Sequence, residues 1–483
     1  MQPLPDLKQL SPSQKDELIL AMHKEILALH KELAGLRQLV LDLQSRLNLN
    51  SRNSSKPPAS DGLNKPAPKS LRVSGHKPSG GQKGHPGSTL RQVVQADEVV
   101  THDVPEQCPA CERRLNMAYV GETRQVFDLP ALGFKVTEHR AMQALCTCGQ
   151  VHTASFPSGV EATVQYGPLA RAAMVHLNHN HALPLQRTAA LMKQLFGLPV
   201  SQTAVHKAGQ EAKEALQPTV DAIAQATMAA TVAHADETGV RVAKKLHWLH
   251  VLATQTLSWM DCHPKRGAQA FDAMGLLGRF KGTLVHDGWM PYKALQCEHA
   301  LCNAHHLREL TYVLEEQGQQ WAGDMIELLR HASHIDNLNC ADGKVPLYAA
   351  GAYQSGVRDL RHLYEAILEQ GELANPRAES SGKRGRTRQS KALNLIDRLR
   401  QYGDEVWRFM TGPDVPFTNN VAEQAIRMPK VKQKVSGCFR TLEGARTYCV
   451  IRSYAATLHK QGADVFAALV STFKGAPVQP SLG

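Results

Sequence analysis

The chain has 483 residues, of which 42% are hydrophobic and 20% are charged, with a formal net charge of +11. It is long enough for two or more domains, and its ten scattered cysteines do not make a disulfide scaffold. The basic balance favours a polyanionic partner, with nucleic acid the natural candidate. No apolar run approaches the roughly 20 residues that span a bilayer, and the N-terminus lacks a signal-peptide pattern. We therefore expect a cytoplasmic protein without membrane association.

Residues 11–49 predict one long helix, which starts at Ser11-Pro12-Ser13 and carries an apolar heptad. Its core positions alternate gaps of three and four: Ile19, Met22, Ile26, Leu29, Leu33, Leu36, Val40, Leu43 and Leu47. Four sustained heptads predict a parallel coiled coil, and hence a homodimer or a higher oligomer. The alternative is an amphipathic helix that docks on the protein's own core.

Residues 50–95 form a basic segment rich in Pro, Gly and Ser, which cannot bury a core. It is predicted to be a flexible linker, and the same composition would let it lie along DNA phosphates as a basic arm.

A zinc-binding module is predicted over residues 96–160, on two pairs of closely spaced cysteines. Two such pairs can complete a tetrahedral shell around one structural Zn²⁺. The ligands would be Cys108, Cys111, Cys146 and Cys148, although His152 could replace one of them. The segment from Val120 to Gln143 resembles strands, as in a zinc ribbon. Four reduced thiols without a metal are the alternative.

Residues 161–229 are predicted to be helical, with helices at 167–181, 185–196 and 201–215. The break Gly197-Leu198-Pro199 and the N-cap Ser201 give the order helix, glycine turn, capped helix. That order is typical of a helix-turn-helix, although any three-helix packing unit looks similar. The candidate DNA contacts are Ser201, Gln202, Thr203 and Lys207.

Residues 230–309 change to a strand pattern, with predicted strands at 231–242, 246–253, 257–260 and 283–286 and a helix at 267–280. Strand, strand, strand, helix, strand is the opening order of the ribonuclease-H-like fold, in which the fourth strand pairs in parallel with the first. The fold class is therefore α/β and multidomain, with a ribonuclease-H-like catalytic core.

Parallel pairing of these strands would make Asp236 and Asp287 neighbours, and a divalent cation would offset the repulsion between them. Mg²⁺, or Mn²⁺ in its place, prefers such oxygen ligands and supports phosphoryl transfer. Taken singly, Asp236 could be a surface acid and Asp287 a turn-forming Asp-Gly.

Glu423 is the third candidate carboxylate, although Asn420 and Glu423 also fit a capping box. A basic stretch that follows it is suited to gripping DNA: Lys430, Lys432, Lys434 and Arg440. Cys302 and His305 have ligand-like spacing but equally suit packing or orientation of the carboxylates. His306 is expected to face solvent, and Arg308 could contact a phosphate or an acid.

Several long strings together resemble the transposases of the insertion sequence 66 family, over nearly the whole chain. They are the heptad, Asn-Ser-Ser-Lys-Pro-Pro (53–58), Gly-Gly-Gln-Lys-Gly-His-Pro-Gly (80–87), the cysteine pairs, His-Ala-Asp-Glu-Thr (234–238), His-Asp-Gly-Trp (286–289), Cys-Asn-Ala-His-His-Leu-Arg-Glu-Leu (302–310) and Thr-Asn-Asn-Val-Ala-Glu-Gln-Ala-Ile-Arg (418–427).

This resemblance implies a DDE transposase whose metal-binding triad is Asp236, Asp287 and Glu423. It implies a helical insertion at 310–404, the last part of the catalytic core at 405–460 and a C-terminal tail at 461–483. The implied partners are the element ends, the target DNA and accessory proteins of the same element.

Two other functions remain open from the sequence. A non-catalytic dimeric DNA-binding regulator would use the coiled coil, the zinc module and the helix-turn-helix, but it leaves the three carboxylates unexplained. A structure-specific nuclease on the same fold would cut DNA without joining it.

Overall fold

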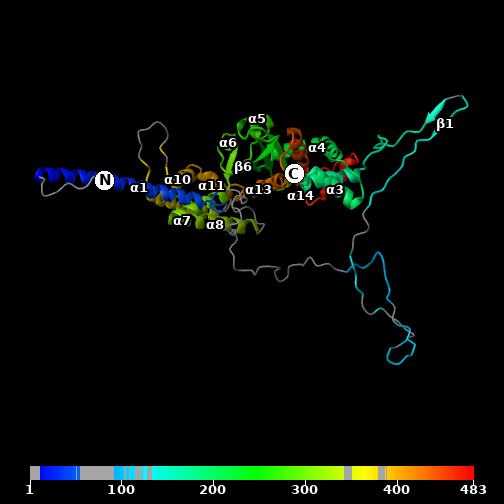
Figure 1. The fold of residues 1–483 in the computed structure, drawn as a ribbon, viewed down its shortest axis with the longest axis horizontal. Coiled ribbons are helices and arrows are strands. Elements are labelled where there is room, and N and C mark those ends of the chain that lie inside the picture. The colour runs from blue at the N-terminus through cyan, green and yellow to red at the C-terminus, as the bar shows by residue number, and fades with distance from the viewer. Residues whose placement is uncertain are drawn as a thin grey trace. The chain divides into compact units, whose positions relative to one another are not determined.

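The structure is a computed structural model. It describes residues 11–50, 52–54, 92–102, 105–107, 109–114, 120, 123–127, 133–148, 150–341, 351–378, 387 and 389–483. The chain divides into two compact units. The larger comprises residues 1–69, 167–183 and 208–483, and the smaller comprises residues 70–166 and 184–207. Each unit is described by itself, and the class is mixed α/β (Figure 1).

A five-stranded mixed sheet is the centre of the larger unit, in the order β5-β4-β3-β6-β7. Its strands are β3 (Val232–Val242), β4 (Lys245–Ala253), β5 (Ser258–His263), β6 (Thr283–His286) and β7 (Glu298–Leu301). β3, β4 and β5 form an antiparallel meander, whereas β6 pairs in parallel with β3 and with β7. His234 lies opposite Val285 in the parallel register. The predicted pairing of the first and fourth strands is confirmed.

The alternating side chains of β3 contact two different helical layers, because successive residues of a strand point to opposite faces. Val240 and Val242 pack in a cluster with Ile426 and Tyr448, from α13 (Asn420–Ser436) and α14 (Leu442–Lys460). On the other face, Ala233 and Ala235 pack in a cluster with residues of α5 (Ala268–Met274) and α6 (Met290–Lys293). The predicted helix at 267–280 ends early, since Gly275 adopts a left-handed φ of 68° and the 3-10 turn Leu277–Arg279 follows.

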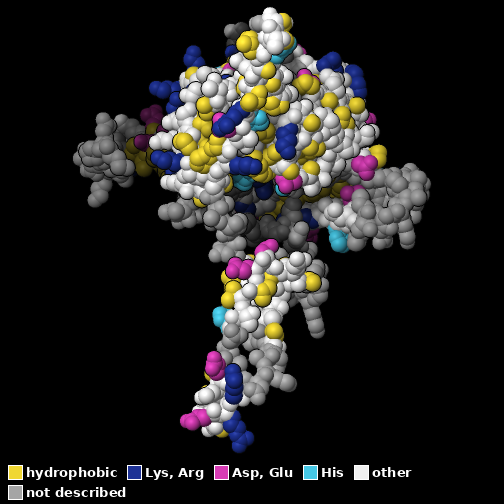
Figure 2. Space-filling view, turned by 90° about the vertical axis from the view of Figure 1, so that its right-hand side faces the viewer, with side chains coloured by type: hydrophobic (Ala, Val, Ile, Leu, Met, Phe, Trp, Pro, Cys, Tyr) yellow, Lys and Arg dark blue, Asp and Glu magenta, His cyan; other side chains and the backbone are white. Residues whose placement is uncertain are grey.

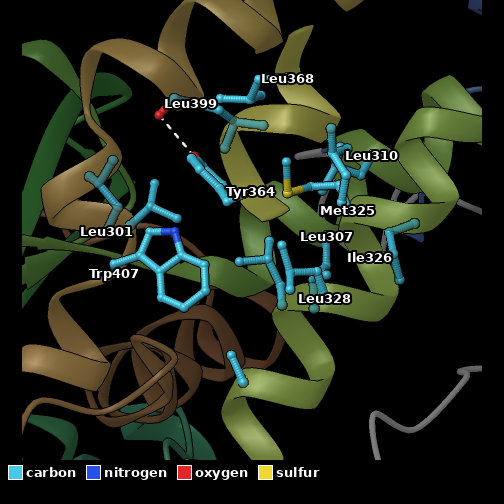
Figure 3. Packing of buried hydrophobic residues seen from close by; sticks show 14 of the residues in the cluster. Leu301, Leu307, Leu310, Met325, Ile326, Leu328, Tyr364, Leu368, Leu399 and Trp407 are labelled. Carbon is cyan, nitrogen blue, oxygen red and sulfur yellow. Dashed lines mark hydrogen bonds between the residues drawn. The ribbon is translucent and has the colours of Figure 1, made fainter. Parts of the chain in front are cut away.

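A helical group follows β7 and has its own hydrophobic core. Its helices are α7 (Asn303–Gln317), α8 (Gln320–Ala341), α9 (Gly351–Ala374), α10 (Lys391–Gln401), α11 (Gly403–Val406) and α12 (Arg408–Thr411). Figure 3 shows Trp407 beside Leu301 at the end of β7, and Tyr364 bonded to the carbonyl of Leu399 at 2.8 Å. This core therefore supports the strand end that leads into α7.

The N-terminal helix α1 runs over Pro12–Leu47 and begins as the sequence predicts. Ser11 and Gln14 form a reciprocal cap, in which each backbone N–H donates to the other side chain. Every heptad position is exposed, from 42% at Met22 to 84% at Leu47. The heptad stripe therefore does not dock on the described core of this chain.

Three of the remaining helices differ from the prediction. α2 (Pro168–Val175) continues as a π-helical turn over His176–Asn180, where one continuous helix to His181 was expected. α4 (Gln202–Ala229) extends beyond the predicted end at 215, and α15 (Val465–Phe473) lies in the predicted C-terminal tail. In the described part of the chain, no helix combines the length and apolarity needed to cross a bilayer.

The smaller unit contains α3 (Leu185–Phe196) and a two-stranded antiparallel hairpin, β1 (Gln143–Leu145) with β2 (Val151–Thr153). The prediction of strands from Val120 to Gln143 is wrong for the residues described there, which are irregular until β1 begins at Gln143. Their apolar side chains, such as Val126 and Phe134, are exposed and pack in no buried core. Without a buried face, strands in this segment would not be stable.

Candidate active site

Three segments that are distant in sequence bring the candidate carboxylates to one region. Asp236 lies on β3, on the face that α13 covers, because it shares its parity with His234 and Val240. Asp287 directly follows β6, the parallel neighbour of β3, and Glu423 lies in the first turn of α13. The sheet register and the packing of α13 therefore direct all three to the same region.

The electrostatics of Asp236 show that these acids are close enough to interact. Burial, together with the nearby charges of Glu237, Asp287 and Glu423, raises the pKa of the Asp236 carboxyl to about 8. The backbone N–H of Glu237 donates to Asp236 at 2.8 Å and acts in the opposite direction. Near neutral pH this carboxyl is therefore protonated unless a cation offsets the charge.

Glu423 does not form the capping box that the sequence offered as its alternative role. The helix begins one residue earlier than that motif requires, since the N-cap is Asn419 and its side chain makes no capping bond. The Oε1 atom of Glu423 is buried without a hydrogen-bond partner among the described residues. A buried carboxylate oxygen without a donor indicates a site for a cation or another ligand.

The Asn419 side chain instead ties α13 to the sheet. Its Nδ2 donates to the carbonyl of Ala235 at 2.8 Å, so its Oδ1 accepts from Nδ1 of His234 at 2.9 Å. Its backbone N–H donates to the Cys302 thiol at 3.1 Å. Burial lowers the pKa of His234 to about 4, so the imidazole is neutral and donates through Nδ1. Asn419 thus fixes the start of α13 next to Asp236.

The opposite face of β3 carries a second acid that the sequence reading did not select. Glu237 is 9% exposed and accepts from Arg266 at 2.9 and 2.5 Å and from the Tyr292 hydroxyl. The Arg266 guanidinium lies 4.6 Å from the ring of Trp248 and 4.0 Å from that of Trp289. This network anchors β3 to α6 beside the site. In the sequence, this network is indicated only by an acid next to Asp236.

Asp287 also makes the turn that the sequence suggested. Its Oδ1 accepts the backbone N–H of Trp289 at 2.9 Å, and Gly288 has a left-handed φ of 87°. A carboxylate has a second oxygen that this turn leaves available, so the turn role and a ligand role are compatible.

Comparison with known protein families matches residues 163–447 to the Transposase IS66 family. That match covers more than half of the chain and includes all three carboxylates. The chain belongs to the IS66 transposase family. Residues 2–91 also match a family of unknown function (DUF6444). A search of curated proteins gave no match.

In this IS66-family chain, the start of α7 faces Glu423. Ligand atoms of Cys302, His305 and Glu423 all lie within 4.8 Å of one another, and this is the one such group among the described residues. The oxygens of Asp236, Asp287 and Glu423 therefore do not all approach one another this closely.

The expectation that His306 faces solvent is wrong. It is 3% exposed and burial lowers its pKa to about 3, since α7 turns its buried face toward the helical core.

Several of the candidate DNA-binding residues are exposed, so a polyanion can contact them. Lys430, Lys434 and Arg440 are exposed, whereas the Lys432 ammonium lies 5.0 Å from the ring centre of Phe439. In the smaller unit, Gln202 and Thr203 open α4, and the Ser201 hydroxyl caps it by accepting from Ala204 at 3.0 Å. Lys and Arg side chains are spread over the face in Figure 2.

The predicted zinc ligands are described only in part. Cys111, Cys146 and Cys148 are exposed and form no disulfide, and Cys108 lies outside the described residues, as does most of the basic segment 50–95. β1 and β2 flank the second cysteine pair, and the backbone N–H of Cys146 donates to Gln150 across the turn between them.

Proposed function

We propose that this protein is a metal-dependent DNA transposase with a ribonuclease-H-like core, in which Asp236, Asp287 and Glu423 are the catalytic carboxylates. The observation that carries the proposal is their convergence from β3, the end of β6 and the start of α13. Two features support it: the parallel pairing of β3 with β6 and the membership of the IS66 family.

The three carboxylates suit Mg²⁺ or Mn²⁺. The donor set is all oxygen, Glu423 has a buried oxygen without a partner, and Asp236 needs a neighbouring cation to ionise near neutral pH. A pair of ions about 4 Å apart also suits these three carboxylates, because their oxygens are too far apart for all of them to bind a single ion. When bound, such ions activate the attacking oxygen and stabilise the leaving oxygen.

The chain's own residues position the reactants. Asn419 and the Glu237–Arg266 pair hold β3 and α13, while Lys430, Lys434 and Arg440 supply positive charge for the DNA backbone. Water attacks a phosphodiester at an element end and frees a 3′ hydroxyl. That hydroxyl then attacks target DNA at the same site, and no covalent protein intermediate forms.

A strand-transfer assay tests this function. Purified protein, Mg²⁺, a DNA end of the element and a target plasmid are expected to give joined products. Cleavage without joining would favour the nuclease, and DNA binding without cleavage would favour the regulator.

Metal binding is expected to depend on pH because the pKa of Asp236 is raised to about 8. Below that pH a divalent cation must displace the Asp236 proton, so its apparent affinity should rise about tenfold per pH unit and level off above pH 8. Mn²⁺ titrations at several pH values measure this slope. The slope should vanish in Asp236→Asn and persist in Asp272→Asn, which changes an exposed acid on α5. An equal slope in all three proteins would contradict the assignment.

The exposed heptad of α1 supports a homodimer that could pair two DNA ends. Replacing Leu29 and Leu36 with lysine should convert the dimer to a monomer, because it places charges at the coiled-coil seam. Light scattering after size exclusion measures the mass. The matched control replaces Ala21 and Ala28 with lysine, which adds the same charge outside the seam. A dimer that survives the leucine changes would place self-association elsewhere.

Three further roles complete the proposal. The four cysteines hold a structural Zn²⁺, the segment 50–95 acts as a basic linker and arm, and α4 contacts DNA through Gln202, Thr203 and Lys207. Accessory proteins of the same element assist in the cell.

A further inference from the structure

Two helix starts meet beside the proposed triad and bring together a thiol, an imidazole and a carboxylate. Cys302 is the N-cap residue of α7 and His305 lies in its first turn, while Glu423 lies in the first turn of α13. Their ligand atoms all lie within 4.8 Å of one another. No other group of His, Cys, Asp and Glu in the described ranges is this compact.

Two of the three groups have polar atoms that are buried without a partner. Oε1 of Glu423 and Nδ1 of His305 are out of contact with solvent, and neither makes a hydrogen bond within the described structure. Because both residues belong to the same compact group, their unpartnered atoms indicate a ligand rather than an isolated packing defect.

Burial raises the pKa of the Cys302 thiol to about 12, so the sulfur is a neutral thiol in the absence of a cation. The side chain is 1% exposed, and its sulfur accepts the Asn419 N–H at 3.1 Å. The backbone N–H groups of Ala304 and His305, at the start of α7, also bond to it. These three N–H donors favour the thiolate and oppose the effect of burial, so they would hold the sulfur as a ligand once a cation replaces its proton. The carboxylates of Asp287 and Glu309 add negative potential near His305, and Arg308 opposes it.

The donor set distinguishes this group from an Mg²⁺ site. Sulfur and imidazole nitrogen are ligands for Zn²⁺ and related ions, whereas Mg²⁺ takes oxygen. Three protein ligands that leave a fourth position open are typical of catalytic zinc sites. Tetrahedral coordination places ligand atoms roughly 3.3–3.8 Å apart, so shifts of about 1 Å would close the site.

We propose that Cys302, His305 and Glu423 bind one Zn²⁺-class ion with an open coordination position, next to the Asp236 and Asp287 carboxylates. The ion links the start of α7 to the start of α13, and its binding releases the thiol proton of Cys302. The metal site rests on its own geometry; only its use in DNA cleavage rests on the proposed function, since Glu423 belongs to both.

Co²⁺ is the probe, because a cobalt–thiolate bond gives a charge-transfer absorption band. Metal-stripped full-length protein is titrated with Co²⁺, and the wild-type spectrum is compared with that of Cys302→Ser. The predicted four-cysteine site can contribute a band of its own, but equally in both proteins. We expect the variant to lose the intensity of one thiolate bond and one equivalent of bound Co²⁺. Cys297→Ser, a change of a half-buried thiol outside the group, should match wild type.

Two further variants protect the result against misfolding. His305→Ala and Glu423→Gln should each weaken Co²⁺ binding at this site at least about tenfold, with cooperative unfolding retained in thermal melts. Identical Co²⁺ spectra and stoichiometry in wild type and in all folded variants would overturn the proposal. Asp236→Asn should keep the wild-type Co²⁺ spectrum. An absence of strand transfer by the wild-type protein would overturn the proposed function and leave this readout unaffected.

Discussion

Replacement of Asp236 by asparagine is expected to lower DNA cleavage and strand transfer by at least about 10³-fold, while binding to element ends stays within a few-fold of wild type. Asparagine keeps the size of the side chain and its hydrogen bond with the Glu237 N–H, but removes the negative charge. Phosphoryl transfer depends mainly on positioning and charge neutralisation, so loss of one metal-binding carboxylate removes most of the rate.

The measurement compares cleavage rates of labelled linear DNA in Mg²⁺ with DNA affinity at fixed salt. Asp272→Asn is the matched control, because it makes the same chemical change at an exposed position on α5 and should keep full activity. Cleavage by Asp236→Asn at the wild-type rate would remove Asp236 from the active site. Loss of DNA binding together with cleavage would instead indicate a folding defect.

The strands that carry Asp236 and Asp287 were predictable because their signal is local. The β-branched and apolar residues in 231–242 and 283–286 favour the strand conformation by themselves, and β6 spans the range predicted for it. The parallel pairing of β3 with β6 followed from strand order, since an intervening helix permits a crossover that a short turn does not.

Features that depend on tertiary contacts could not be predicted from local sequence patterns. His306 looked like a solvent-facing residue, yet the packing of α7 on the helical core buries it. Asn420 and Glu423 fit a capping box by spacing, but α13 starts where Asn419 bonds to His234 and Ala235, which lie 185 and 184 residues earlier in the chain. No local pattern encodes such a pairing, and the same holds for the bond between Glu237 and Arg266.

The contacts of Asn419 join three segments beside the proposed triad. It bonds to His234 and Ala235 on β3 and to Cys302 before α7, and it directly precedes α13. Because Glu423 lies one turn into α13, this amide helps to set the placement of that carboxylate relative to Asp236.

Replacement of Asn419 by alanine is therefore expected to lower the cleavage rate about 100-fold, because a shift of about 1 Å in a catalytic group has an effect of that order. The substitution also leaves the His234 imidazole and the Ala235 carbonyl unpaired, which should cost about 1–3 kcal/mol in the free energy of unfolding. Asn375→Ala is the matched control, since Asn375 is also buried and bonds to Gln319 and the Gly371 carbonyl, within the helical group. Both variants should lose similar stability in urea, but only Asn419→Ala should lose activity under conditions where both are folded. Equal loss of activity in the two variants would show that Asn419 acts through stability alone.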